Sequence, residues 1–229
     1  MKYSVILLCL ALSVPMVSMA QGEVGSFSVM PKVGVCLANI SGAEIVYTGE
    51  TGDKTMKGKY NARLTAGVDV EYRAHELFGV VLGVAYSQQG CRYSNHEWKS
   101  EAISDSREKM DYLQIPLMGK VYLGSGFSAG VGVQLGVLLS DKMTYTVETI
   151  TKDNDGNTIY NNEKKVEDDM KWARRKTDFS IPIGVSYEYN NVVVGARYNL
   201  GLGNLWKDDD FATEKSKAFT FTVGYRFVL

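Results

Sequence analysis

The sequence has few residues suited to catalysis or metal binding. It contains only two histidines, His75 and His96, and has no His-Glu-x-x-His or Cys-x-x-Cys spacing, so a zinc site is not expected. A Ser-His-Asp triad would need one of these histidines, and His96 beside Ser94 or Ser100 is the one candidate. We therefore expect no catalytic, metal or cofactor site and interpret the protein as non-enzymatic.

Calcium and nucleic acid are also not expected as ligands. Residues 153–157 resemble the start of a calcium loop, but Lys164 occupies the position where such a loop needs its bidentate acid. Asp155-Gly156 fits the tip of a β-hairpin instead. The formal net charge is −1, which gives no polybasic surface for nucleic acid.

Long hydrophobic runs are missing after the N-terminus, so no transmembrane helix is expected there. At the N-terminus, Lys2 and the short apolar run Val5–Leu12 precede small residues that end at Ala20, the pattern of a signal peptide. We predict cleavage after Ala20, which removes residues 1–20 and leaves residues 21–229 as one domain. An uncleaved membrane anchor is the alternative. The mature chain is then either exported and soluble, or it crosses a membrane as a barrel.

Only two cysteines, Cys36 and Cys91, follow the predicted signal peptide. Their positions in the strand pattern place both on the same face, but in the first and third predicted strands. Neighbouring strands are about 4.8 Å apart, so a strand between them separates the two thiols beyond comfortable disulfide geometry. Two free thiols are favoured over a disulfide.

Alternation of apolar and small or polar residues dominates the rest of the chain, and helical periodicity is almost absent. In the clearest segment, 127–140, one face carries Phe, Ala, Val and Leu, and the other carries mainly Gly and Ser. Strands of about 9–11 residues can cross a bilayer at a tilt. The pattern therefore predicts an all-β, eight-stranded antiparallel up-and-down transmembrane β-barrel. Its predicted strands are 27–37, 62–72, 78–87, 112–123, 127–140, 178–188, 192–200 and 219–229.

The connections between these strands alternate in length. Short connections at 73–76, 124–126 and 190–191 come at one end of the barrel. Long polar connections come at the other end, at 41–59, 91–110, 141–175 and 201–217. Periplasmic turns and longer extracellular loops alternate in this way in outer-membrane barrels. Segments 145–150 and 158–160 also predict a hairpin that extends the fifth and sixth strands beyond the membrane.

Glycine and other small residues dominate the less apolar face, which predicts that this face lines a narrow lumen and that the apolar face contacts lipid. A soluble lipocalin-like barrel, with its apolar face inward, is the alternative. Charges are costly toward lipid, so we expect the strand charges to form an internal ion-pair network. The predicted network consists of Lys32, Arg63, Asp69, Glu71, Lys120, Glu188, Arg197 and Arg226.

Aromatic residues recur at the short-turn ends of the predicted strands. A ring of aromatic side chains at one level is typical of a bilayer interface. General β-propensity is the alternative explanation, because it enriches aromatic residues anywhere in a strand. The predicted girdle consists of Phe27, Tyr72, Phe78, Phe127, Tyr189 and Phe227.

Five segments, in order along the mature chain, are similar to motifs of the outer-membrane β-barrel domain family common in Bacteroidetes, which includes the PorT-like proteins. The resemblance implies an eight-stranded barrel and no catalytic site. Family members usually end at or near an aromatic residue that helps the barrel-assembly machinery recognise them, whereas here Val228 and Leu229 follow Phe227. The five segments are Val33–Gly42, Leu113–Leu117, Gly130–Ser140, Gly195–Leu202 and Gly224–Phe227.

Three hypotheses for function follow. The leading one is a monomeric bacterial outer-membrane barrel with a filled lumen, inserted into lipid by the barrel-assembly machinery. It would act through its long loops on an extracellular or envelope partner, in surface interaction, envelope integrity or secretion. The second is a narrow channel for ions or small solutes. The third is a soluble periplasmic barrel that binds an apolar ligand.

Overall fold

The computed structural model describes residues 23–42, 44–49, 52–98, 100–153, 155, 157–207 and 213–229. Only the backbone is described at residues 44–49, 52–56, 96 and 98. The predicted signal peptide, residues 1–20, lies outside the described residues. Within the described ranges, no helix is long and apolar enough to cross a membrane.

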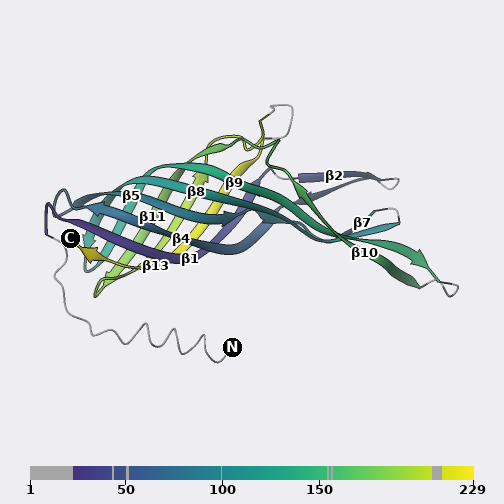
Figure 1. The fold of residues 1–229 in the computed structure, drawn as a ribbon, viewed down its shortest axis with the longest axis horizontal. Helices are drawn as coiled ribbons and strands as arrows, with labels where there is room; N and C mark the ends of the chain where they lie inside the picture. The colour runs from purple at the N-terminus through teal and green to yellow at the C-terminus, as the bar shows by residue number, and fades with distance from the viewer. Residues whose placement is uncertain are drawn as a thin grey trace, which may run out of the picture.

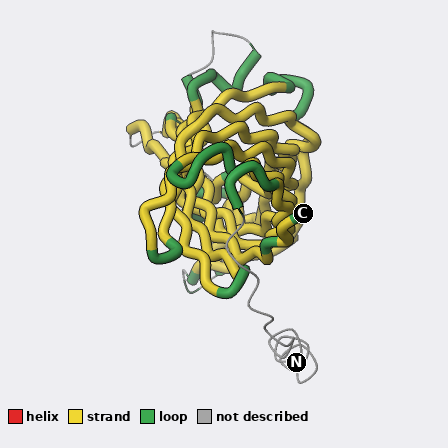
Figure 2. The backbone as a smooth tube through the Cα atoms, turned by 90° about the vertical axis from the view of Figure 1, so that its left-hand side faces the viewer, coloured by secondary structure: helices red, strands yellow, loops and turns green. Residues whose placement is uncertain are grey.

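Eight antiparallel strands form a closed barrel, as predicted (Figures 1 and 2). Each strand pairs with the next around the ring, and the last pairs with the first, with Val33 opposite Val223. Figure 2 looks along the barrel from its short-turn end. The ring consists, in order, of β1 (Phe27–Ser41), β4 (Lys59–Tyr72), β5 (Phe78–Gln89), β8 (Glu101–Gly124), β9 (Phe127–Lys152), β11 (Thr177–Tyr189), β12 (Val192–Gly201) and β13 (Lys215–Tyr225).

Shorter strands extend the barrel, mostly at the loop end. β2 (Glu44–Gly49) and β3 (Gly52–Lys57) form a separate hairpin, and β6 (Cys91–Arg92) pairs with β4 and β8. β7 (His96–Trp98) pairs with the start of β8, and β10 (Thr158–Asp169) pairs with the end of β9. These two strands and the ends of β8 and β9 form a sheet that projects beyond the barrel (Figure 1), which we call the projecting sheet. At the opposite end, β14 (Phe227–Val228) pairs with β1.

The predicted long connections 91–110 and 141–175 consist largely of strands, and for 91–110 this was not predicted. β8 already begins at Glu101, and β9 continues to Lys152. Both faces of the β8 extension are largely polar, so the alternation that marks a membrane strand is absent there, yet its backbone pairs with β9 from Glu101↔Thr149 onward. The predicted hairpin is present between β9 and β10. However, β10 does not continue into β11, because a turn over residues 170–176 separates them.

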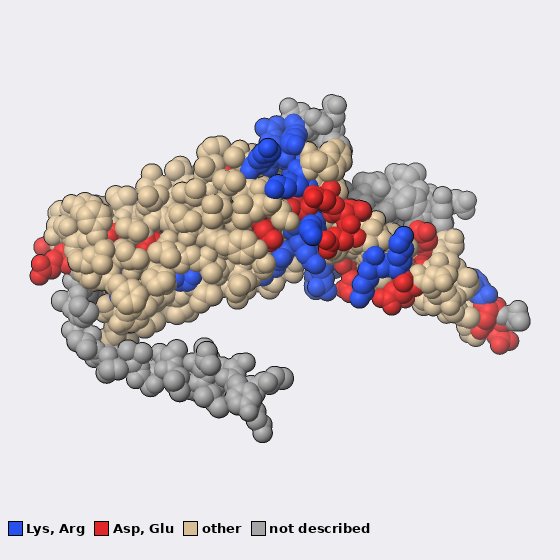
Figure 3. All heavy atoms as spheres, viewed as in Figure 1, with Lys and Arg blue, Asp and Glu red and all other residues tan. Residues whose placement is uncertain are grey.

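The apolar face of the barrel points outward and its glycine-rich face inward, as predicted. Leu82 of β5 is 52% exposed, and its apolar neighbours Val80 and Val84 are also exposed, whereas Gly83 points inward. Figure 3 shows this body almost free of charge, with the charged side chains gathered at the loop end. Such an apolar outer surface is favourable in lipid and costly in water. This orientation of the two faces is the reverse of that in a soluble lipocalin-like barrel, whose apolar face points inward.

Glycine is required where the interior is most crowded. A Cβ atom on Gly83 would lie 2.2 Å from Oδ1 of Asp69 and 3.1 Å from Cγ of Pro116. The missing side chain therefore makes room for the Asp69 carboxylate inside the barrel. In the turn between β8 and β9, Gly124 and Gly126 adopt φ angles of +87° and +84°, which glycine accepts without steric cost.

Candidate functional site

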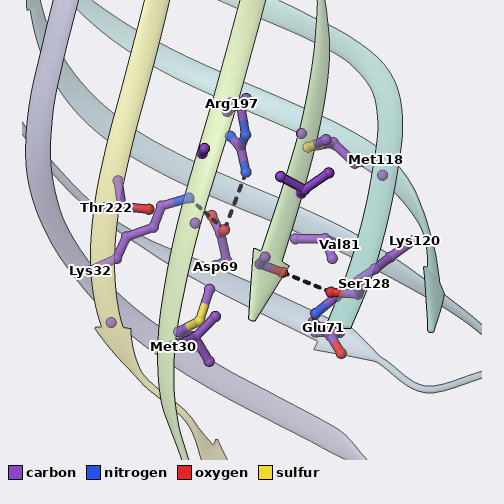
Figure 4. A pocket seen from close by; sticks show the side chains of 18 of the residues that line it. Met30, Lys32, Asp69, Glu71, Val81, Met118, Lys120, Ser128, Arg197 and Thr222 are labelled. Carbon is purple, nitrogen blue, oxygen red and sulfur yellow. Dashed lines mark hydrogen bonds and ion pairs between the residues drawn. The ribbon is translucent and has the colours of Figure 1, made fainter. Parts of the chain in front are cut away.

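The first charge cluster of the lumen is centred on Asp69, which points inward from β4. Its Oδ2 atom lies 2.5 Å from Nζ of Lys32 on β1 and 3.6 Å from Nη2 of Arg197 on β12. Figure 4 shows the carboxylate between these two cations. Lys32 and Asp69 are almost completely buried, so water screens this pair much less than a surface pair.

The second cluster is centred on Glu71, two residues further along the same face of β4. Its carboxylate lies 2.9 Å from Nζ of Lys120 and 2.8 Å from Nη1 of Arg226, and it accepts a hydrogen bond from the Tyr122 hydroxyl. Arg226 also places Nε 3.0 Å from Oε2 of Glu188. One carboxylate therefore connects residues that are far apart in the sequence.

Arg63, the last of the eight predicted network residues, lies nearer the loop end. Its Nη2 atom is 3.6 Å from Oδ1 of Asp111, and its Nη1 donates to the Gln89 carbonyl oxygen. All eight predicted residues thus make ion pairs inside the barrel. The sequence analysis missed Asp111 because the predicted strand begins only at Tyr112, whereas β8 begins at Glu101.

Two cavities adjoin this network. One, of about 80 Å³, lies in the middle of the lumen between Asp69, Arg197 and Lys120. The other, of about 280 Å³, lies at the short-turn end and is lined by Arg73, Tyr122 and Ser125 among others. Glu71 lines both cavities. The Glu71 ion pairs therefore lie where the two spaces meet.

The six predicted girdle aromatics all point outward and are exposed. The rings of Phe27 and Tyr72 contact each other, with centroids 4.8 Å apart. A second aromatic group, which the sequence analysis missed, lies toward the loop end. In this group the Phe219 ring is 4.6 Å from Tyr198 and 6.3 Å from Tyr60. Part of the signal was available in the sequence, because Tyr198 and Phe219 lie in predicted strands, whereas Tyr60 precedes the predicted strand 62–72.

A buried arginine lies at the loop end and was also missed. Arg174, in the turn before β11, is only 2% exposed. Its guanidinium donates to Asp141 Oδ2 at 3.1 Å, to Glu214 Oε2 at 2.5 Å and to the Glu108 carboxylate. The same group stacks 3.6 Å from the ring centroid of Trp206. We call these five residues the Arg174 cluster.

The Arg174 cluster joins two strands to two loops. Glu108 and Asp141 come from β8 and β9, beyond Leu113 and Leu139, where the outward apolar alternation of these strands ends. Arg174 and Glu214 come from the irregular segments on either side of β11 and β12. The backbones of Arg174 and Trp206 also form an isolated bridge. The cluster therefore fixes both irregular segments over the mouth of the barrel.

Three carboxylates surround one cation in this cluster, so negative charge is in excess. Burial raises the pKa of Glu108 to about 7, and the nearby Asp141 and Glu214 carboxylates add to the effect of burial against the opposing Arg174 charge. Burial likewise raises the pKa of Asp141 to about 6. Protonation of Glu108 and Asp141 therefore stabilises the folded state. This contribution to the free energy of unfolding is lost as the pH rises through the two pKa values.

An apolar cluster packs next to the Arg174 cluster, inside the mouth. It contains Cys91, Met110, Tyr112, Leu138 and Leu205, with Ile40 and Tyr93. Cys91 donates a weak hydrogen bond to Glu108. Cys36 and Cys91 are both free and buried, as the strand geometry predicted.

The described residues form no catalytic group around either histidine. His75 accepts a hydrogen bond from the Leu77 backbone in a short turn, and only the backbone of His96 is described. In the described part of the chain, no three His, Cys, Asp or Glu side chains are grouped to hold a metal ion.

A closed antiparallel barrel with an apolar exterior and an ionic interior defines an integral β-barrel membrane protein. The comparisons with known proteins narrow this class. Residues 19–207 match the model of the outer membrane protein beta-barrel domain, and the chain belongs to this family. No curated protein matches the sequence significantly.

Several solved outer-membrane barrels are similar in fold. Ail, the attachment invasion locus protein of Yersinia pestis, is 14% identical with a TM-score of 0.47, over 90% of this chain and 100% of its own. Neisserial surface protein A is 14% identical with a TM-score of 0.39, over 88% and 97%. OprG from Pseudomonas aeruginosa is 11% identical with a TM-score of 0.39, over 90% and 97%.

Proposed function

We propose that this protein is a non-enzymatic outer-membrane barrel with a closed lumen that acts through its extracellular end on another protein. The observation that carries the proposal is the contrast between the two parts of the molecule. The barrel interior is filled with paired charges, whereas β10, the edge strand of the projecting sheet, exposes almost all of its side chains.

The lumen network and the aromatic groups have structural roles in this proposal. The ion pairs of Asp69 and Glu71 hold side chains across the lumen, and the Arg174 cluster closes the loop end. The exposed rings at the short-turn end, with Tyr60, Tyr198 and Phe219 at the other end, lie at the two bilayer interfaces. The space between the ends is then occupied by protein, as expected for an eight-stranded barrel.

The projecting sheet supplies the interaction surface. Eleven of the twelve residues of β10 are exposed, and in the described residues this strand pairs only with β9. An unpaired strand edge can bind an extended segment of a partner through backbone hydrogen bonds. β10 carries four acidic and two basic residues, which favours a protein partner over a polyanion.

We expect the purified, refolded protein to show no steady conductance in planar bilayers. The reason is that ion pairs cross the lumen and an apolar cluster packs inside the mouth. A regular single-channel step that scales with protein concentration would contradict the closed-lumen proposal and favour the narrow channel. A deletion of residues 202–207 is the matched positive control, because it removes Leu205 and Trp206 from the mouth.

We expect trypsin to cleave the projecting sheet in intact cells. Lys152 lies near its tip, and Lys164 and Lys165 lie in the middle of β10. All three are exposed, and each can be cut when the sheet faces outward. Fragment masses would identify the site. Arg73, in a short turn at the opposite end, is the internal control and should be cut only after the outer membrane is permeabilised. Cleavage after Arg73, but not at the sheet, in intact cells would reverse the proposed orientation.

Several finer assignments belong to the same proposal. Export removes residues 1–20, and the mature chain 21–229 is one monomeric barrel that the barrel-assembly machinery inserts into the outer membrane. The PorT-like assignment rests on the five sequence motifs. It concerns a subgroup within the family that the chain matches.

A further inference from the structure

We propose that the loop end of the barrel carries a basic belt that binds the phosphate head groups of anionic lipids in the surrounding leaflet. The belt lies beyond the apolar surface of four neighbouring strands, β9, β11, β12 and β13. This inference goes beyond the proposed function, because the partner is a lipid at the barrel wall and not a protein at the projecting sheet. The belt consists of Lys171, Lys176, Lys207 and Lys217.

Backbone contacts place two of these lysines where the lipid-facing surface of β9 ends. The outward apolar alternation of β9 ends at Leu139, which is 43% exposed. Nζ of Lys171 donates to the Leu139 carbonyl oxygen at 2.6 Å, and the backbone N–H of Leu138 donates to the Lys176 carbonyl oxygen at 2.8 Å. Both lysines therefore lie at the boundary between the apolar barrel body and the loop end, where Figure 3 shows cationic side chains gathered.

The other two lysines continue the belt over β12 and β13. Lys207 follows β12 and is exposed, and its Nζ atom donates to the Trp172 carbonyl oxygen. Lys217 lies opposite Leu200 of β12. It shares the outward parity of Phe219, the exposed ring two residues further along β13. The belt therefore follows the upper edge of the lipid-facing surface from β9 to β13.

Carboxylates do not neutralise these ammonium groups in the part of the chain that the structure describes. There, none of the four lysines forms an ion pair, and Lys171 and Lys207 donate to backbone carbonyl oxygens. Asp169, at the end of β10, accepts a hydrogen bond from the backbone N–H of Lys171 and not from its ammonium group. Residues 208–210, three aspartates that follow Lys207 in the sequence, lie outside the described residues. The belt thus offers positive charge to an external anion.

An exposed tryptophan beside the lysines favours a lipid over a soluble anion. Trp172 is 72% exposed, and tryptophan is enriched at the level of lipid head groups because its ring is apolar and its N–H is polar. Phe179 and Leu202, joined by a backbone hydrogen bond, expose apolar surface on the barrel wall next to the belt. A lysine stem can cover such a surface while its ammonium group binds phosphate. A molecule on the belt therefore meets charge and acyl chains together.

Fluorescence quenching by brominated lipids tests the belt on the refolded mature protein. Vesicles of phosphatidylcholine and phosphatidylglycerol are prepared with bromine on one lipid or the other, close to the head group. Both leaflets have the same composition, so the result does not depend on orientation. The association constant of phosphatidylglycerol relative to phosphatidylcholine should be about five, the effect of one ammonium group near an anionic surface. Trp172→Phe supplies the background from the other two tryptophans.

Salt and a triple variant should both remove this preference. In about 1 M NaCl, which screens exposed charges, the relative association constant should fall toward one, and this measurement needs no variant. Lys171→Gln, Lys207→Gln and Lys217→Gln in one chain should lower it to about one at low salt. Glutamine keeps part of the stem, so the variant should still show the heat-modifiable folded form on unboiled gels.

The matched control removes the same charge from the projecting sheet. Lys152→Gln, Lys164→Gln and Lys165→Gln in one chain should leave the lipid preference unchanged. Equal association of the two lipids with the wild type would overturn the belt, and so would a preference that survives its triple variant or is lost equally in the control. Binding of soluble dextran sulfate that only the belt variant loses, with its lipid preference intact, would assign the lysines to a soluble polyanion instead.

Discussion

Replacing Arg174 by methionine is expected to lower the free energy of unfolding by about 3–5 kcal/mol at pH 8, the cost of removing one partner from a buried ion pair. The reason is that Glu108, Asp141 and Glu214 would remain buried without their common cation. Methionine keeps most of the side-chain volume, so packing changes least. Urea unfolding in lipid vesicles, followed by tryptophan fluorescence, measures the loss.

Acid should partly rescue this variant. The pKa values of Glu108 and Asp141 are already raised in the wild type, to about 7 and about 6, and without Arg174 they should rise further. At pH 5 the carboxyl groups would be largely protonated and would need no cation, so the destabilisation should be smaller than at pH 8. Arg107→Met is the matched control, because Arg107 forms an exposed pair with Asp105 and should cost no more than about 1 kcal/mol. A cost for Arg174→Met that is equally small, or independent of pH, would show that the cluster does not hold the mouth.

Replacing Glu71 by alanine in the lumen should lower the free energy of unfolding by a similar amount, about 3–5 kcal/mol. Lys120 and Arg226 would lose their shared carboxylate while they stay almost fully buried. The folded fraction on unboiled gels and the urea midpoint in vesicles both measure this. Arg197→Ala should cost less, because Arg197 lies 3.6 Å from Asp69 and leaves the closer Lys32 pair in place.

A double-mutant cycle separates lost pairing from lost packing. When Glu71→Ala is combined with Lys120→Met, the second change removes a charge that the first left unpaired, so the costs should be less than additive. Glu76→Ala, in the exposed turn after β4, is the control and should have little effect. Fully additive costs for Glu71 and Lys120 would argue against the network.

The barrel itself was predictable from the sequence, and the reason is visible in β5. Phe78–Gln89 alternates between large apolar residues and Gly, Ala or Ser, because one face meets lipid and the other a narrow interior. The same alternation predicted that the side chains of Asp69, Glu71 and the other lumen charges point inward. Short turns such as Gly124-Ser125-Gly126 fixed which strands are neighbours.

Beyond the membrane this information is lost. In Glu101–Met110, polar residues occupy both faces of β8, so nothing in the pattern distinguishes a paired strand from a loop. Glu108 and Asp141 therefore had no visible connection to Arg174, which comes from an irregular turn far along the chain. A shift of register also reverses the parity on which such predictions rest, as in β9, where Leu138 and Asp141 are both buried.

The seam of the barrel joins the first and last strands of the ring. Lys32 pairs with Gly224 and Ser28 with Val228, so the ring closes only between the earliest and the latest strands. Loop-closure entropy makes contacts at such long sequence separation slow to form. A chain that still lacks its last strand would keep two unpaired strand edges and an apolar outer surface in contact with water. The topology therefore leaves apolar surface and strand edges uncovered until the last strand pairs with the first.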